Sequence, residues 1–556
     1  MNLIGNINAI PFRRFRGGGG VSPIPPFPSI PGMIARYSAL GLTNEQMAAN
    51  PVWVDKTGNG HDLQMKNFAW KGMSGVGGYV GDFSKWVNNR DTTEIGITKS
   101  NSKVIIDVKV SQGSGKNIVF ISKSNLGISN NVTIKITSTY PEGVMKFANS
   151  ASNKYLKLPS NGIITLQDNP EYTSNEMHLH LASADLGQIT IEQLPLYPGA
   201  LVFDGVDDYG TCDNFPILTK EKGYTVVALR QWITRGEIAQ GLVSNVKNWI
   251  KDGAFLLEYR NIQAEHLNKP ISFGAIGSEN DLPHILTYQT SKSYNGVSIT
   301  TGNFEGTDVL HVGKLAPTKV GTCINAAIWE LVFLDHDATE EELTKIKDYF
   351  VKTYPWLFPD QAWTVTGKTN EDEDRATIAN ITGNGNDLVL SNFGFAEGSG
   401  YNEEGEYAGY LVTDGVDDKI VSSSFGMGKD FMIVGDWKFI DNKKSGTGLV
   451  KGSSFYIYNT MIGLDLYINS GSVKNSFDGI KSINAACSDG RVYDPNWDEM
   501  LANTGNVVGS GGMLEVSSSG GRFDRIAFKN LAIYPRILSK DECIKAYNYL
   551  QTLKAK

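Results

Sequence analysis

The carboxylates with the most suggestive spacing lie in two short turns of nearly identical sequence, FDGVDDY and TDGVDDK. Their six aspartates are Asp204, Asp207, Asp208, Asp414, Asp417 and Asp418. Calcium prefers carboxylate oxygens as ligands, so each turn could contribute to a calcium site. The same residues are typical of tight turns and strand starts, and this structural interpretation is favoured. We therefore expect no cofactor, with calcium as the less favoured alternative.

Two further patterns imitate metal sites. DKTGNG, beginning at Asp55, resembles the opening of an EF-hand loop, but the twelfth position, where a bidentate Glu is needed, holds Lys66. His178 and His180 alternate on one face of an expected strand. No third ligand lies near the histidines in sequence, so a polar strand face is favoured over a metal site. We expect no metal-binding residues.

Patterns of catalysis are missing. The sequence contains no GxSxG, HExxH or P-loop motif. A glycoside hydrolase places two carboxylates across the scissile bond. The densest acidic run, Asn370–Ala376, is interpreted as a charged loop in solvent. We expect no catalytic residues and no enzyme.

One loop-like segment without strand alternation, RVYDPNWDEM, combines aromatic rings with polar partners, as a sugar site requires. The candidate glycan contacts are Tyr493, Asp494, Asn496, Trp497 and Asp498. The alternative, that Trp497 closes one end of a sandwich, is equally favoured.

The elements that position these residues occur twice in the same order. TGNGHDLQMKNF (Thr57–Phe68) matches TGNGNDLVLSNF (Thr382–Phe393), and the two DGVDD turns follow. Near each end, a strand runs into a short helix that opens with Thr339-x-x-Glu342 or Ser539-x-x-Glu542, the pattern of a capping box. The chain is therefore expected to contain one domain in two copies.

The spacing within the copies predicts an insertion. Gly58 and Asp204 are 146 residues apart, whereas Gly383 and Asp414 are 31 apart, and the difference of 146 − 31 = 115 is the size of a small domain. The extra stretch, 85–196, contains short alternating segments separated by turn residues. We interpret it as a β-sandwich inserted into the first copy.

Residues 1–34 differ from the rest. FRRFRGGGGVSPIPPFPSIPG is rich in glycine and proline and predicts an extended arm. The segment is more apolar than a free tail, which favours docking on a partner. The expected docking residues are Phe12, Arg13, Arg14, Phe15, Arg16 and Phe27, with the arginines facing an acidic surface.

Composition and charge exclude some classes of partner. The net charge of −8 and the pI near 5.5 argue against nucleic-acid binding. No apolar run approaches the roughly 18 residues of a membrane span, so no membrane insertion is expected. The four scattered cysteines are expected to be buried hydrophobes. The N-terminus lacks the order of a secretory signal, so synthesis in a cytoplasm is expected.

The ordered motifs resemble the LamG-like, or concanavalin A-like, jelly roll over about 440 residues. The matching segments are Asp55–Leu63, Phe203–Tyr209 and Ala338–Leu343, then Asn380–Leu388, Asp414–Lys419 and Leu538–Cys543. The second copy departs from the family pattern at Asn380, Thr413 and Cys543, and the first at Ala338. The hydrolases of this class carry Glu-x-Asp-x-x-Glu on one strand, and nothing here matches that pattern.

The resemblance implies an all-β fold of two jelly rolls. The expected domains are the arm (1–34), a first jelly roll (35–356, interrupted by 85–196) and a second (357–556).

The opening MNLIGNINAIPFRR, the arm and GLTNEQMAANPVW also resemble virion appendage proteins of crAss-like tailed phages of gut Bacteroidetes. This resemblance implies a head or tail fibre located in the virion, with the arm on other virion proteins, a homotrimer and host or mucosal glycans as further partners. The alternative is a cellular carbohydrate-binding LamG-like protein of a Bacteroidetes bacterium.

Overall fold

The computed structural model describes residues 24–555 with internal gaps. The gaps are 112–114, 129–131, 150–154, 167–174, 184, 219–222, 235–239, 246–254, 260–262, 267–268, 273–283, 290–292, 295–296, 299–306, 316–322, 441–446, 452–454, 460–462, 469–473, 479–481, 502–509, 517 and 520–521. Sheets dominate the described residues and their strands pair antiparallel, which confirms the expected all-β class.

The first sandwich (24–78 and 195–357) has two sheets, each of eight strands over the described residues. One runs β24 (Val297–Ser298), β23 (Ser293–Tyr294), β22 (His284–Gln289), β17 (Thr225–Thr234), β26 (Asn325–Leu334), β15 (Leu201–Asp204), β4 (Gly75–Val76), with β1 (Met33–Ser38) also on β26. The other runs β2 (Val52–Trp53), β3 (Leu63–Lys66), β16 (Tyr209–Cys212), β25 (Leu310–Val312), β18 (Val243–Ser244), β19 (Phe255–Tyr259), β20 (Gln263–His266), β21 (Lys269–Ser272). Both sheets bury side chains in one core that includes Trp53, Phe203 and Phe333.

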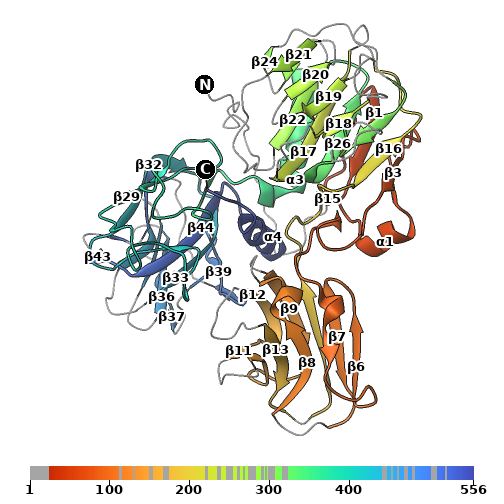
Figure 1. Ribbon diagram of the computed structural model, residues 1–556. Helices are drawn as coiled ribbons and strands as arrows, with labels where there is room; N and C mark the ends of the chain where they lie inside the picture. The colour runs from red at the N-terminus through yellow and green to blue at the C-terminus, as the bar shows by residue number, and fades with distance from the viewer. Residues whose placement is uncertain are drawn as a thin grey trace. The chain divides into compact units, whose positions relative to one another are not determined.

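Residues 79–194 form a smaller sandwich with a core of their own, drawn largely in orange in Figure 1. Its described strands form β11 (Tyr155–Lys157), β10 (Met145–Asn149), β13 (Glu176–Leu181), β8 (Lys116–Ser122), β5 (Val87–Asn88), and opposite them β12 (Asn161–Leu166), β9 (Val132–Ser138), β14 (Gly187–Gln193), β7 (Lys103–Val108), β6 (Ile95–Lys99). The chain leaves the first sandwich after Gly78, earlier than residue 85, because Phe83 and Trp86 already belong to the core of the insert.

The second sandwich (358–555) repeats the strand order of the first over the described residues. One sheet runs β30 (Gly400–Asn402), β31 (Tyr410–Val412), β44 (Ile526–Tyr534), β33 (Met432–Phe439), β38 (Ala485–Cys487), β39 (Arg491–Tyr493), β40 (Glu499–Leu501), with β27 (Gln361–Thr364) on β44. The other runs β28 (Thr377–Ile378), β29 (Leu388–Ser391), β32 (Lys419–Met427), β41 (Ser510–Val516), β34 (Thr447–Lys451), β35 (Phe455–Asn459), β36 (Gly463–Ile468), β37 (Lys474–Asp478). The hairpin β42 (Ser518–Ser519) and β43 (Arg522–Phe523) stands beside them.

Helices are short and few in the described parts of the chain: α1 (Asn44–Ala49), α2 (Lys123–Leu126), α3 (Glu340–Thr353), α4 (Lys540–Leu550), and the 3₁₀ turns η2 (Phe83–Lys85) and η4 (Pro355–Leu357). Each sandwich ends on a helix, α3 or α4, and both open with a complete capping box. Thr339 or Ser539 accepts from the backbone of the Glu three residues on, whose carboxylate bonds back. None of the helices among these residues is long and apolar enough to cross a membrane.

Candidate functional site

The repeated Gly-Asn-Gly turn fastens the first strand of each sandwich. In the first sandwich the buried Asp55 carboxylate accepts from the backbone N–H of Arg36 on β1 at 3.0 Å. Asn59, at the tip of the turn, donates to the carbonyl of Ile34 at 2.8 Å. These bonds satisfy backbone groups at the start of the domain, so the turn has a structural function.

The second sandwich makes the same fastening with a different residue. Asn380 takes the place of Asp55, and its Oδ1 accepts from the N–H of Ala362 at 3.3 Å. Its Nδ2 donates to Gln361 Oε1 and, at 2.6 Å, to the carbonyl of Gly385. An amide brings a donor that a carboxylate lacks, and the neighbouring Gln361 supplies the acceptor. The replacement of Asp by Asn in the second copy therefore keeps the turn intact.

The aspartate that ends each DGVDD turn is buried and accepts hydrogen bonds from neighbouring residues. Asp208 accepts from Ser74 Oγ at 3.0 Å and from the N–H of Asp204 at 3.0 Å. In the second sandwich Asp418 accepts from Ser399 Oγ at 3.1 Å. Burial, together with the nearby Asp204 carboxylate, raises the pKa of Asp208 to about 7. Burial raises that of Asp418 to about 6, although its hydrogen bonds oppose the shift.

Both acidic turns have the spacing of a cation site. One oxygen from each of the three aspartates in a turn lies within 4.8 Å of the others. Such a cluster offers the hard oxygen ligands of calcium. However, Asp208 already directs both of its oxygens to protein donors, so its hydrogen bonds account for this buried carboxylate without an ion.

The predicted glycan loop is a hairpin of β39 and β40, which corrects the expectation of a loop without strand pairing. Trp497 is 1% exposed, stands at φ 63° and packs edge-on against Tyr547 with ring centroids 5.5 Å apart. Tyr493 is fully buried, and its hydroxyl donates to Glu499 Oε2 at 3.2 Å. Neither ring offers a face to a sugar, so the expected stacking role is wrong for both and Trp497 closes the sandwich instead.

The polar residues of this hairpin remain at the surface. Asn496 and Asp498 are exposed, while the half-buried Asp494 carboxylate accepts from both of their backbone N–H groups, at 2.9 and 2.7 Å. Asp494 therefore stabilises the turn. The predicted site therefore keeps its two exposed polar side chains but has no accessible aromatic ring of Tyr493 or Trp497 for a sugar to stack on.

The arm residues divide into two groups. Phe12, Arg13, Arg14, Phe15 and Arg16 lie outside the described residues. Phe27 contacts its own domain. Its ring lies 4.1 Å from the Arg36 guanidinium and 4.8 Å from the Tyr349 ring on α3. The expectation that Phe27 docks on a partner is corrected accordingly, because its ring packs within the chain.

Beneath Phe27 lies a buried ion pair that the sequence pattern did not reveal. Glu330 on β26 is fully buried and receives Arg36 Nε and Nη2, both at 3.1 Å, and Tyr354 Oη at 2.7 Å. Burial raises the pKa of Glu330, while Arg36 acts in the opposite direction. A single acid within the apolar run AIWELVFL was the available signal. Phe27 packs against the Arg36 guanidinium, and both Glu330 oxygens accept hydrogen bonds, so the pair has a structural role.

A second feature is an aromatic residue three positions after the asparagine that donates to each DGVDD turn, Asn67 to the carbonyl of Asp207 and Asn392 to that of Asp417. Trp70 stands at φ 51°, is partly exposed and stacks on Phe68 with ring centroids 4.7 Å apart. Phe395 holds the matching position at φ 48°, with the Arg375 guanidinium 5.1 Å from its ring. Positive φ is rare for bulky residues. Trp70 precedes a tight turn closed by the Lys71–Ser74 bridge. The N–H of Ala69 donates to Ser74 Oγ at 2.8 Å and stabilises this turn.

No family model and no curated protein matches this chain. Among solved structures it is similar to Trypanosoma rangeli sialidase in complex with sialic acid, at 10% identity over 82% of this chain and 84% of that one, with a TM-score of 0.25. It is also similar to the binding domain of botulinum neurotoxin serotype C1 (8% identity, 61% and 86% coverage, TM-score 0.23) and to that of botulinum neurotoxin DC in complex with SialylT (10%, 60% and 90%, 0.24). Likenesses this weak support no conclusion about the fold or function of this chain.

Proposed function

We propose that this chain is a structural appendage protein of a tailed-phage virion, a head or tail fibre whose arm docks on the particle. Its two large sandwiches are then concanavalin A-like jelly rolls that arose by duplication and project outward. The phage assignment rests on the resemblance of the N-terminal segment and domain order. The proposal includes no catalysis. Among the carboxylates described above, Asp55, Asp208 and Asp494 accept hydrogen bonds from their own domain.

The observation that carries the proposal is the join between arm and first sandwich. Phe27 packs between Arg36 and Tyr349, and Ile30 is 5% exposed. The chain is thus fixed to the domain from about residue 27 onward. Upstream of this point the sequence places Phe12, Phe15 and the three arginines, a composition suited to a partner with apolar and acidic surface.

The first experiment measures mass in solution by light scattering, for the full chain and for a variant lacking residues 1–23. This cut leaves Phe27 and Ile30 in place, so the first sandwich keeps its contacts. We expect a trimer that is lost with residues 1–23. A matched control, R13E/R14E/R16E, keeps the arm length and reverses its charge. A monomer for the full chain would contradict the trimeric fibre assignment.

Glycan binding is the second candidate, and Trp70 is the residue that favours it. Trp70 is partly exposed and follows Asn67 by three positions, and the exposed Asn67 donates to the carbonyl of the exposed Asp207 at 3.1 Å, so a ring and polar groups occur in one segment. We propose that any sugar is held there. A glycan array should then lose signal with W70A and keep it with N496A/D498A, which alters the hairpin with the buried Trp497. The reverse pattern would return the site to that hairpin.

A further inference from the structure

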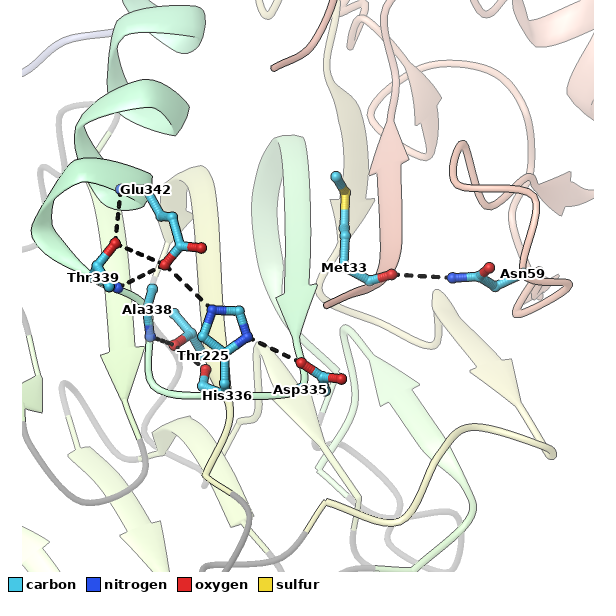
Figure 2. Close-up of polar contacts among 8 residues, drawn as sticks. All are labelled: Met33, Asn59, Thr225, Asp335, His336, Ala338, Thr339 and Glu342. Atoms are coloured by element: carbon cyan, nitrogen blue, oxygen red, sulfur yellow. Dashed lines mark hydrogen bonds and ion pairs between the residues drawn. The ribbon is translucent and has the colours of Figure 1, made fainter. Parts of the chain in front are cut away.

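His336 lies between two carboxylates at the end of the first sandwich (Figure 2). Its Nδ1 is 3.0 Å from Asp335 Oδ1, and its Nε2 is 3.3 Å from Glu342 Oε2 on α3. The imidazole is about one-third exposed, at 32%. Only the protonated ring can donate from both nitrogens, because neutral imidazole has one N–H. Both contacts can therefore be hydrogen bonds at the same time only when the ring is protonated.

Asp335 contacts the base of the arm, residues 27–34, through its backbone, and its side chain lies close to Gly32. The N–H of Asp335 donates to the carbonyl of Gly32 at 2.9 Å. Gly32 stands at φ 68°, and a Cβ there would lie 2.9 Å from both Asp335 Cγ and His336 Nδ1. One residue on, the carbonyl of Met33 accepts from Asn59 Nδ2 at 3.1 Å (Figure 2). The arm base is thus held from two sides, and the His336 turn forms one of them.

The second carboxylate connects the same imidazole to α3. Glu342 Oε2 also accepts from Thr339 N and Thr339 Oγ1, both at 2.8 Å, within the capping box. Two turns further along α3, Tyr349 packs against Phe27. His336 therefore links the turn after β26, which contacts Gly32, to the first turn of α3, the helix whose Tyr349 packs against Phe27.

No arm attaches to the matching turn of the second sandwich. This turn lacks both the backbone N–H donor of Asp335 and the titratable side chain of His336. In the gapless match of the two C-terminal segments, Pro535 and Arg536 replace Asp335 and His336, while Glu542 is retained. Proline has no N–H to donate. Arginine stays protonated throughout the physiological range. A titratable contact therefore occurs in the copy that carries the arm.

We propose that His336 is a pH-sensitive clasp for the base of the arm. As imidazolium it holds Asp335 and Glu342 together and so fixes Gly32 and the start of α3. On deprotonation one of the two hydrogen bonds is lost, and the arm base loosens. This inference goes beyond the proposed fibre function and applies to any partner that the arm binds.

The groups around the imidazole define the direction of the switch. The charged groups in contact with it, among the described residues, are Asp335 and Glu342, and Asp337 follows in the same turn. From β17, Thr225 Oγ1 donates to the carbonyl of His336 and accepts from the N–H of Ala338, both at 2.8 Å, and neither bond involves the imidazole (Figure 2). The arm contributes Gly32, which carries no charge.

The pH dependence follows from these contacts. Partial burial lowers the pKa of His336, but its hydrogen bonds to Asp335 and Glu342 outweigh burial and the net shift is upward. A raised folded pKa means that the stabilisation is complete below the unfolded value, near 6.5. It is lost as the pH rises through the folded pKa. The clasp is closed in mild acid and open in mild base.

The test is hydrogen–deuterium exchange of the full chain between pH 5.5 and 8.5, expressed as protection factors so that the intrinsic pH dependence of exchange is removed. The peptide of interest covers residues 27–38. H336R copies the second sandwich and keeps a permanent charge, H336Q is neutral at every pH, and H180Q on β13 is the control histidine variant.

For the native chain and H180Q we expect several-fold lower protection of this peptide at high pH than at low pH. H336R should stay protected throughout and H336Q should be poorly protected throughout. Flat protection in the native chain across the titration of His336, followed by NMR, would overturn the proposal. So would a pH dependence of H336R equal to that of the native chain.

Discussion

Replacing Arg36 by alanine should open the first sandwich locally, because the substitution strands a buried acid. Glu330 is fully buried, and the Arg36 side chain is 13% exposed. Removing one member of such a pair costs about 3–5 kcal/mol, because the remaining charge has no counterion. Loss of the cation–π contact between the Arg36 guanidinium and the Phe27 ring costs about 0.5–1 kcal/mol more. An exposed pair would cost at most about 1 kcal/mol.

The loss should depend on pH. Burial already raises the pKa of Glu330, and Arg36 opposes that shift. Without Arg36 the pKa rises further, and the folded domain escapes the penalty by protonating the acid. A raised carboxyl pKa gives stability that is present at low pH and lost as the pH rises through the folded value. R36A should therefore be far closer to the native chain at pH 5 than at pH 8.

Local hydrogen exchange of peptides from β1 and β26 is the suitable assay, since a chain of several domains does not unfold in two states. The summed cost of about 3.5–6 kcal/mol corresponds to faster exchange by roughly two and a half to four and a half orders of magnitude at pH 8. The second sandwich provides the control. Ala362 pairs with Ala532 as Arg36 pairs with Val332, and buried Asn530 stands where Glu330 does. R36A/E330N copies this neutral pair and should recover most of the protection.

Two results would refute this reasoning. Exchange in R36A that rises by less than roughly fivefold would assign the pair the small value of a surface salt bridge. An equal loss for R36A at pH 5 and pH 8 would show that the stranded charge is not its cause.

Three further predictions follow from single contacts. W497A should destabilise the second sandwich by about 3–5 kcal/mol, seen as a lower calorimetric transition, while glycan-array signals measured below that transition stay unchanged; selective loss of a sugar signal would contradict the burial of Trp497. D208N removes a carboxyl whose pKa is raised to about 7, so the melting temperature of the native chain relative to D208N should fall as the pH rises from about 4 to 7 and then level off; a constant difference would refute the shift. G32A places a Cβ against Asp335 and His336 at φ 68° and should speed proteolysis after the arm, whereas G41A, with open space around it, is the matched glycine control.

The sequence was most informative where a motif sets both the backbone and its partners. The Thr339 and Ser539 capping boxes could be predicted because each depends on two residues three positions apart. The burial of Trp497 could not be predicted, because the same sequence is compatible with an exposed ring and with a ring buried at the end of the sandwich. Only the packing against Tyr547 distinguishes the two. Likewise, Arg36 and Glu330 are 294 positions apart, and pairing over such a separation leaves no local pattern.

The two sandwiches differ most informatively at the places where the chain enters and leaves them. Both bury a residue at the position of Glu330, but only the first places a charge there and covers it with Arg36 and Phe27. Both close on a helix with a capping box, but only the first has a histidine before it. The second sandwich has the same strand order with a neutral Asn530 and with Arg536 at these positions, so this fold does not by itself require the Glu, the Arg and the His of the first. What distinguishes the first sandwich is the arm, and all of these residues or their partners contact its base. The simplest physical account is that they hold that segment in place.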